Sequence, residues 1–401
     1  MRIRELRTTG HWPTLLSAFV YFDVSFMIWV LIGALGIFIA QDFNLSATLG
    51  GFVVAVPILA GSLLRLPMGV AVDRFGPKRV GALGLVLTVV PLLVGWLGAR
   101  SLGGLVAAGL LLGIAGASFA VALPLASRWY PPRLQGFVMG IAGAGNSGTV
   151  VAAFFAPRLA EHVGWHAVFG LALIPLAAGL AVYALVARDS PTQPPPRPLG
   201  EYLAVLSVGD TWWFNLFYMV TFGGFVGLAS YLPVFFHDQY GISRVMAGNL
   251  TALCVLLGSF LRPVGGALAD RFGGLRVLAL LYAVVGVFMI GVSALPMLPL
   301  TTILLFAGMS GLGMGNGSVF QLVGQRFRDE IGVVTGLVGA AGGLGGFLLP
   351  FVTGLLKDVT GSYGTGFFLF GLVGFGCAGL LLYVSRVWRR SWAAAGLEAA
   401  V

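Results

Sequence analysis

Two arginines, Arg65 and Arg262, lie at matching positions in apolar stretches of the two halves of the chain. The segments around them, 61–80 and 258–277, share 11 identities in 20 positions at an offset of 197 residues. An arginine at the centre of a lipid-embedded helix costs about 3 kcal/mol even on lenient insertion scales. We therefore expect both guanidinium groups to serve a function, and the simplest function is to bind an anion.

The composition identifies an integral membrane protein. Hydrophobic residues make up 58% of the 401 residues, charged residues only 9%, and the mean hydropathy is +0.97. Each apolar stretch is long enough to span a bilayer as a helix, and we expect the first to remain as helix 1 because no cleavage site follows it. We predict an all-α membrane protein with twelve transmembrane helices at 15–40, 47–71, 79–98, 102–127, 135–157, 165–187, 211–236, 246–269, 275–296, 299–322, 331–356 and 364–385.

The net charge of +9 is distributed unevenly between the two sides of these predicted spans. Of the 23 basic residues, 17 fall on the side of the two termini, two are Arg65 and Arg262, and the others are Arg100, Arg158, Arg244 and Lys357. An excess of Lys and Arg marks the cytoplasmic side. We therefore predict that both termini are cytoplasmic, and the distribution argues against nucleic acid as a partner.

A proline-rich segment, 188–198, separates the two sets of six stretches. Proline cannot continue a helix, and proline-rich segments act as semi-rigid linkers. We predict six-helix bundles at 1–187 and 209–401 joined by a cytoplasmic linker at 188–208. Parallel six-helix repeats with a substrate site at the midplane between them are the architecture of major facilitator transporters.

A repeated charged loop resembles the signature loop of the major facilitator superfamily. We expect its first glycine to permit close helix approach and its carboxylate to cap or pair with a neighbouring helix end. The loop follows the second span and returns after the eighth, as Gly69, Asp73, Arg74, Phe75, Gly76 and Arg79 and as Gly266, Asp270, Arg271, Phe272, Gly273 and Arg276.

A narrower resemblance, to the nitrate/nitrite porter family of that superfamily, extends over essentially the whole chain. It implies nitrate, with nitrite as an alternative, as the substrate. At the position that matches Asn146 the second half has Gly342, so any twofold symmetry of the site is approximate. The segments that carry the resemblance are Gly116–Phe119, Ala142–Gly148, Tyr218–Gly227, Gly313–Gly317 and Gly336–Gly346.

The depth of the two arginines is consistent with a shared binding site. Each lies eight residues before the aspartate of its loop, Asp73 or Asp270, and thus about 12 Å from the helix end. Two guanidinium forks facing each other across the bundle interface suit a small planar oxyanion such as nitrate. The alternative is that each arginine pairs with helix carbonyls or with Asp23 and only holds helices together.

Further candidate ligands come from residue spacing together with the family resemblance. Tyr218 and Phe222 are four residues apart and share a helix face, where a phenol can donate to an anion. The resemblance implies that Tyr218 binds substrate, that Phe222 and Phe119 form an apolar clamp, and that the Asn146 amide reaches the anion. Without it, packing and a hydrogen bond between helices are the ordinary interpretations.

Asp23 is the only carboxyl group that we predict within the membrane. An anion that enters a negatively charged cell moves uphill by about 2.3 kcal/mol per 100 mV, so import requires a co-transported cation or exchange. Asp23 lies at a depth comparable with Arg65, and its protonation would be linked to anion binding. A structural aspartate is the alternative, although the segment Tyr21–Trp29 resembles the symporter-type branch of the porter family.

The sequence thus predicts a nitrate transporter of the plasma (inner) membrane that works by alternating access and imports nitrate with protons. A nitrate/nitrite antiporter and a transporter of another small anion are the alternatives. We expect a monomer in contact with membrane lipids, no cofactor, no metal and no enzyme activity. The GxGxxG match at Gly143–Gly148 lies within a predicted membrane helix, and His162 and His166 fall at a loop with no third ligand.

Overall fold

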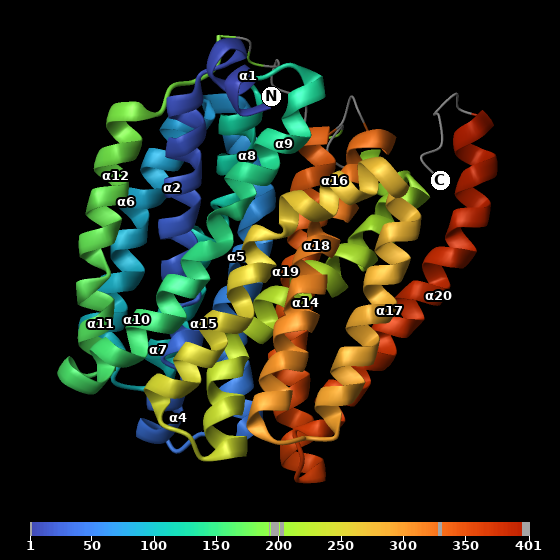
Figure 1. Cartoon of the computed structure of the whole chain (residues 1–401). Helices are drawn as coiled ribbons and strands as arrows, with labels where there is room; N and C mark the ends of the chain where they lie inside the picture. Colours follow the sequence, from blue (N-terminus) through green and yellow to red (C-terminus); the bar gives the residue numbers. More distant parts are fainter. Residues whose placement is uncertain (1, 192, 194–199, 201–203, 328–330, 395–401) are drawn as a thin grey trace.

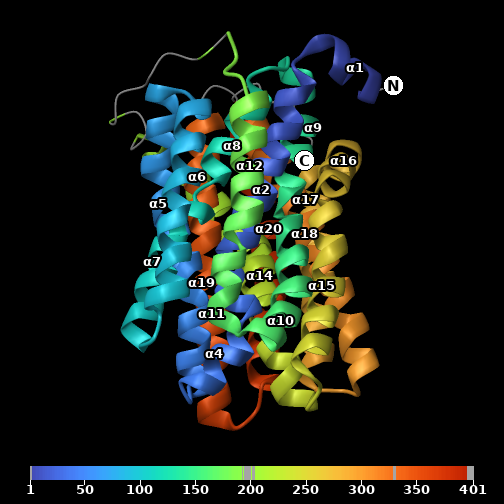
Figure 2. The ribbon, with the colours of Figure 1, turned by 90° about the vertical axis from the view of Figure 1, so that its left-hand side faces the viewer.

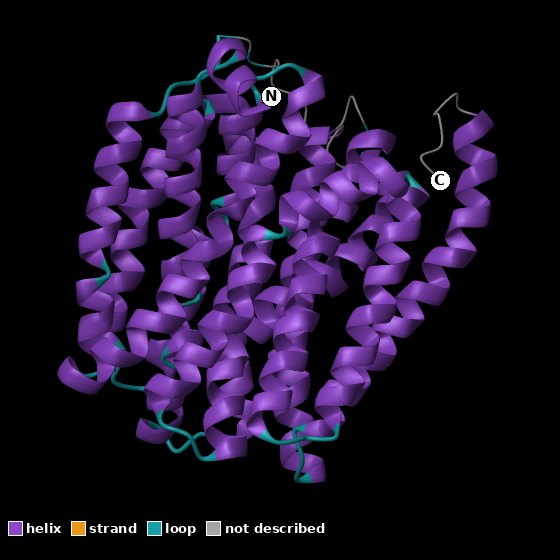
Figure 3. Ribbon diagram, viewed as in Figure 1, coloured by secondary structure: helices purple, strands orange, loops and turns teal. Residues whose placement is uncertain are grey.

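The part of the chain that the structure describes is helical throughout. The computed structural model describes residues 2–191, 193, 200, 204–327 and 331–394. Within these ranges every regular element is a helix, and Figure 3 shows helices joined by short loops, without a strand. Twelve helical segments are long and apolar enough to cross a membrane, which confirms the predicted number of spans.

The helices form two sets of six spans. The first set comprises α1 (Arg2–Thr9), α2 (Trp12–Trp29), α3 (Leu31–Ala34), α4 (Gly36–Asp42), α5 (Ala47–Phe75), α6 (Pro77–Leu93), the π-helix η1 (Val94–Gly98), α7 (Leu102–Gly116), α8 (Phe119–Ser127), α9 (Pro132–Gly143), the 3-10 helix η2 (Ala144–Ser147), α10 (Gly148–Val163), α11 (Trp165–Leu171) and α12 (Leu173–Val186). The second comprises the 3-10 helix η3 (Val205–Ser207), α14 (Gly209–Tyr240), α15 (Arg244–Phe260), α16 (Arg262–Phe272), α17 (Gly274–Ser293), α18 (Leu298–Arg326), α19 (Ile331–Thr360) and α20 (Gly364–Ala394).

Five spans that the sequence predicted as single helices are interrupted partway along their length. The interruptions lie at Val30 and Leu35, at Ala117 and Ser118, in the 3-10 turn η2, at Ala172, and at Leu261. At the last of these, Pro263 follows the first residue of α16 and has no N–H to donate to the preceding turn. Discontinuous helices are found beside the substrate sites of many transporters, where freed backbone groups line a cavity.

The helix ends explain part of the repeated loop motif. Gly76 and Gly273 end α5 and α16 with φ of 82° and 92°, a conformation that residues with a Cβ seldom adopt. At the other end of the corresponding spans, Ser46 and Ser243 each accept a hydrogen bond from a backbone N–H of the first turn. The same local signals therefore begin and end the second and eighth spans.

The two sets of spans form two bundles that stand side by side. Figure 1 shows the first bundle in blue to green and the second in yellow to red, and Figure 2 shows α10 beside α15 and α5 beside α19. Helix α1 and the end of α20 lie at the same end of the molecule, which we call the terminal face. The end that carries the loops at 43–46, 241–243 and 361–363 is the opposite face. The cytoplasmic location of the terminal face stays a prediction.

The connection between the bundles lies largely outside the described residues. Residues 192, 194–199 and 201–203 of the predicted linker belong to that part. Helix α12 ends at Val186, Arg188 and Asp189 are non-helical, and α14 begins at Gly209.

At the opposite face, a carboxylate of the second bundle caps a helix of the first. Asp358 on α19 accepts hydrogen bonds from the backbone N–H groups of Ala47 at 3.2 Å and Thr48 at 2.7 Å. It also accepts one from the Thr48 hydroxyl at 2.5 Å. A negative charge at a helix N-terminus is favourable because it faces unpaired N–H groups and the positive end of the helix dipole. Asp358 therefore ties the start of α5 to the other bundle.

Further polar contacts join the bundles at this face. The Gln41 side chain on α4 accepts from Arg244 at 2.5 Å and lies 3.2 Å from Nε2 of His237. Arg158 on α10 donates to the side-chain oxygen of Asn249 at 2.6 Å. Four pairs of elements, α5 with α19, α4 with α14, α4 with α15 and α10 with α15, are thus joined by polar contacts at the opposite face.

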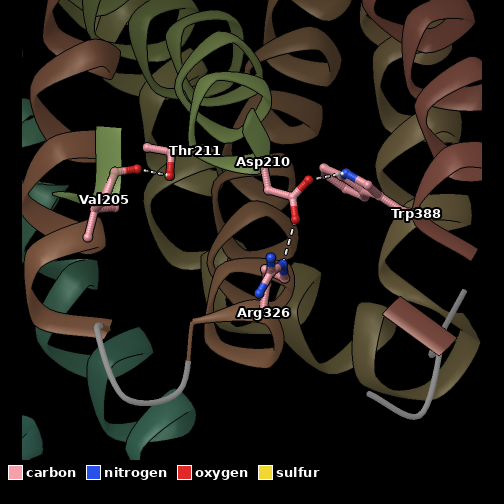
Figure 4. A network of polar contacts seen from close by, with 5 residues as sticks. All are labelled: Val205, Asp210, Thr211, Arg326 and Trp388. Atoms are coloured by element: carbon pink, nitrogen blue, oxygen red, sulfur yellow. Dashed lines mark hydrogen bonds and ion pairs between the residues drawn. The ribbon is translucent and has the colours of Figure 1, made fainter. Parts of the chain in front are cut away.

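At the terminal face, two ion pairs between described residues each lie within a single bundle. Arg128 pairs with Asp73 at 2.5 Å in the first bundle. In the second, Asp210 accepts from Arg326 at 2.5 Å and from the Trp388 indole at 2.7 Å (Figure 4). A Cβ added at Gly69 on α5 or at Gly336 on α19 would meet no atom within 4 Å. The expected close approach of another helix at Gly69 is therefore not observed.

We predict that Asp358→Ala weakens bundle contact at the opposite face. Loss of a carboxylate cap removes about 1 kcal/mol, or roughly a five-fold shift in a two-state equilibrium. Spin labels at Asn44→Cys and Val359→Cys, both exposed positions, should report a larger population of long distances by double electron–electron resonance. Asp238→Ala is the matched control, because Asp238 accepts from Tyr363 within the second bundle. Identical distance distributions in all three proteins would contradict this role of Asp358.

Candidate anion site

Arg65 is fully buried on α5 and is held by carbonyl groups from both bundles. Its Nε donates to the Gly116 carbonyl at 3.3 Å, and its Nη1 donates to the Gly339 carbonyl on α19. The interruption after α7 frees the first of these acceptors, since Ala120 donates its N–H to Ala117 instead of Gly116. The alternative in which Arg65 pairs with helix carbonyls is therefore partly observed. Its Nη2, however, has no partner among the described residues.

Arg262 is the first residue of α16 and is 4% exposed. Its Nη2 donates to the Tyr218 hydroxyl at 3.2 Å, and its Nη1 is buried without a partner in the described part of the chain. Because the Tyr218 oxygen accepts from Arg262, its own proton remains available for another acceptor. The two arginines thus differ in their protein partners but share one property, a buried guanidinium nitrogen that is free to donate.

Both guanidinium groups lie against the same aromatic ring. The Phe119 centroid is 5.0 Å from the central guanidinium carbon of Arg65 and 5.5 Å from that of Arg262. Phe222 lies 5.0 Å from the Arg65 carbon, and Phe320 lies 5.3 Å from the Arg262 carbon. Electron-rich ring faces stabilise the buried positive charges without neutralising them. Both guanidinium groups therefore lie beside Phe119, while the predicted facing of the two forks stays a prediction.

The rings around the arginines also contact one another. Tyr218 stacks on Phe222 with centroids 5.1 Å apart and an interplanar angle of 5°. Phe320 packs edge-on against Tyr218 at 4.9 Å and lies 5.9 Å from Phe119. Tyr218, Phe119 and Phe222 are fully buried. The structure therefore brings together five of the predicted residues: Arg65, Arg262, Phe119, Tyr218 and Phe222.

Asn146 lies in the 3-10 turn η2 beside Arg262. A Cβ at Gly143, one turn earlier, would be 3.3 Å from the guanidinium carbon of Arg262. Residues three apart in a 3-10 helix share a face, so Asn146 faces the same region. It is fully buried, and neither amide atom has a hydrogen-bond partner among the described residues.

Asp23 lies on α2, which packs against η2. Its carboxylate accepts from the Ser147 hydroxyl at 2.5 Å, and within the described residues it forms no ion pair with either arginine. Pairing with an arginine, one form of the structural alternative, is therefore not observed. Asn146 and Ser147 are adjacent, so a single turn lies between the arginines and Asp23.

The signature-loop residues lie at the terminal face, away from the arginines. Asp73 pairs with Arg128, which follows α8, whereas Arg74, Asp270 and Arg271 are exposed. Gly266 would place a Cβ 3.7 Å from the Gly317 carbonyl, an ordinary contact. In this structure the motif contributes helix ends and an ion pair within a bundle, and no contact with the candidate site.

Sequence reasoning missed several of the rings around the arginines. Trp29 lies 5.4 Å from the Arg65 guanidinium carbon, and Phe22 and Phe26 continue the aromatic cluster toward Phe119 and Phe222. All three belong to the segment Tyr21–Trp29, whose aromatic content was the available signal. Phe320 is four residues after Asn316, but nothing in its spacing alone indicates that it contacts Arg262.

The geometry fits a small anion with several oxygen acceptors. Two buried cations without a carboxylate between them leave a strong positive potential in an apolar region. The free Nη atoms, the Tyr218 hydroxyl and the Asn146 amide supply donors, while the rings provide flat walls. Such a site disfavours cations and offers a neutral molecule nothing to offset the buried charge.

Comparison with known proteins assigns the chain to a family. The model for the Major Facilitator Superfamily matches residues 17–350. The chain is 37% identical over 343 residues to the nitrite extrusion protein of Bacillus subtilis (strain 168), covering 85% of this chain and 86% of that protein. It belongs to the nitrate/nitrite porter family of this superfamily. The porter is also 36% identical over 353 residues to the "Probable nitrate/nitrite transporter NarK2" of Mycobacterium tuberculosis (strain CDC 1551 / Oshkosh), covering 86% and 89%.

The fold of the porter agrees with this assignment. A crystal structure of a D-xylose-proton symporter superposes with a TM-score of 0.75 and covers 92% of this chain and 97% of the symporter. At 16% sequence identity this similarity establishes the fold and says nothing about the substrate. The porter is therefore a multi-pass membrane protein with the major facilitator fold.

Proposed function

We propose that this porter carries nitrate across the cell (inner) membrane by alternating access and imports it together with protons. The observation that carries the proposal is the pair of buried guanidinium groups, each with one nitrogen that has no partner among the described residues and each beside the Phe119 ring. Nitrate is planar, carries one negative charge and presents three acceptor oxygens, so it can bind several donors at once while its face lies against a ring. The names of both relatives refer to nitrate or nitrite.

In this proposal the terminal face lies in the cytoplasm, and bundles at 1–187 and 209–401 rock about the site, joined by a linker at 188–208. A monomer surrounded by lipid suffices, because the arginines come from the two halves of one chain. Polar contacts between described residues of the two bundles are present at the opposite face, as expected for a state closed toward the outside.

Asp23 is the proposed proton site. Asp23 accepts a hydrogen bond from Ser147. Ser147 is adjacent to Asn146 in the turn η2, which lies beside Arg262. Binding of the anion would favour protonation of a nearby carboxylate, and by reciprocity protonation would favour anion binding.

Nitrate/nitrite exchange is the second candidate. The Bacillus subtilis relative is named a nitrite extrusion protein, which favours export of nitrite as part of the cycle. An exchanger needs no proton site, because one anion leaves for each that enters. Transport of another small anion is a third, weaker candidate.

The first test concerns the two arginine forks. Arg65→Lys and Arg262→Lys should each lower the initial rate of labelled nitrate uptake into proteoliposomes by roughly ten-fold or more. Lysine keeps the charge, but it cannot keep its protein partners and also donate to the anion. Arg100→Lys is the matched control, because Arg100 is exposed in the loop before α7 and lies outside the candidate site. Near-normal uptake by either site variant would refute the claim that both arginines bind substrate.

A second test concerns the phenol. Tyr218→Phe should weaken nitrate binding to the purified protein by about 1 kcal/mol, or roughly five-fold, which corresponds to one hydrogen bond. Tyr282→Phe is the control, since the Tyr282 hydroxyl donates to the Phe217 carbonyl at 2.6 Å and its removal should affect stability alone. Unchanged binding in the Tyr218 variant would assign that residue to packing.

The third test separates symport from exchange. Asp23→Asn should abolish nitrate accumulation driven by a pH gradient while largely sparing nitrate-for-nitrate exchange, because a neutral amide imitates the protonated acid but cannot release a proton. The measurement is labelled nitrate uptake into vesicles with and without a pH gradient and with and without internal nitrite. Equal pH-driven uptake by wild type and variant would exclude Asp23 as the proton site. A requirement of the wild type for internal nitrite or nitrate would favour exchange.

A further inference from the structure

Asn316 on α18 is a buried amide that the proposed mechanism leaves unexplained. Its side chain is fully buried, and neither Oδ1 nor Nδ2 has a hydrogen-bond partner among the described residues. Other polar side chains of the same helix bond to the carbonyl four residues earlier, as Ser310 does to Phe306 and Ser318 to Met314. A buried amide without partners is unfavourable unless a ligand or water satisfies it.

The neighbours of Asn316 show where its side chain points. A Cβ at Gly315 would meet Thr221 of α14 at 2.7 Å, whereas a Cβ at Gly317 would meet the Arg262 carbonyl of α16. Successive helix positions are 100° apart, so Asn316 faces the wedge between α14 and α16. Phe320, one turn later on nearly the same helix face, occupies this wedge and contacts Tyr218 and Arg262.

The internal repeat supports the same placement independently. In the first bundle Gly61 packs on Gly116, where a Cβ at Gly61 would lie 3.0 Å from the Gly116 Cα. The residues 197 positions later, Gly258 and Gly313, pack on each other in the same way. This register pairs Phe119 with Asn316. Phe119 is the ring that contacts both arginines, so Asn316 occupies its counterpart on the second bundle.

We propose that Asn316 is a further substrate ligand, whose side-chain NH2 donates to an oxygen of the anion bound between the arginines. It rests on the proposed function and deepens it, because the site then receives one amide from each bundle, Asn146 and Asn316. The first bundle presents the flat ring of Phe119 where the second presents a donor. A planar oxyanion can use both groups, with its face against the Phe119 ring and an oxygen atom on the Asn316 amide. A spherical halide has no distinct face and edge, so it gains less from this arrangement.

The test is nitrate titration of the purified full-length protein by calorimetry, with the melting temperature measured in the absence of nitrate. Asn316→Leu removes the donor at similar size and should lower nitrate affinity roughly ten-fold, the effect of one hydrogen bond to a charged ligand. Its melting temperature without nitrate should be unchanged or higher. Asn316→Ala, which fits in any packing arrangement, should show the same loss of affinity and provides the measurement if the leucine variant does not fold.

Two further comparisons make the outcomes distinct. Ser318→Ala, on the same helix, removes a hydroxyl that bonds to the Gly265 carbonyl at 3.1 Å and should leave nitrate affinity unchanged. Chloride, tested as a competitor, should lose less affinity than nitrate in the Asn316 variants. Wild-type affinity for nitrate in either Asn316 variant would overturn this inference alone. Failure of the wild type to bind nitrate or nitrite would instead overturn the proposed function, and this inference with it.

Discussion

The central constraint on this structure is the burial of two guanidinium groups in an apolar interior without a carboxylate to neutralise them. An unpaired charge in such a region carries a large desolvation penalty. The protein offsets part of it with two carbonyls for Arg65, a phenol for Arg262 and a shared set of aromatic rings. The interruption at Ala117 contributes one of these acceptors, because it leaves the Gly116 carbonyl without its helical N–H donor.

The polar contacts that we describe differ between the two faces of the molecule. At the opposite face, Asp358, Gln41 and Arg158 each bond across the interface. At the terminal face, Asp73 and Asp210 form ion pairs within their own bundles. Polar contacts at a helix end can be exchanged for water at little net cost, since each hydrogen bond contributes only about 1 kcal/mol. Such an interface stabilises the arrangement in which the bundles meet at the opposite face, and it also allows them to separate there.

The two halves are similar in sequence but contribute differently to the site. Arg65 is bound by carbonyls and Arg262 by a phenol, and Phe119 and Asn316 occupy equivalent positions with opposite polarity. The duplicated scaffold thus provides the equal depth of the arginines, while the differences supply walls on one side and donors on the other. A planar anion needs both the walls and the donors, because its face is flat and its acceptor oxygens lie at the edge.

The sequence by itself determined the number of spans, the paired arginines, the positions of Phe119, Tyr218 and Phe222, and the family. The spans and the arginines follow from hydrophobic length, from the burial penalty of a charge and from a repeat, all of which are local or can be read by aligning the chain with itself. The family and the places of the three rings follow from the resemblance of whole segments to the nitrate/nitrite porters. Only the tertiary structure decided that Arg65 bonds to Gly339, that Asp23 bonds to Ser147 and that Phe320 contacts Arg262. Each of these joins residues far apart in the chain, and which of them meet depends on how the helices pack and where they are interrupted.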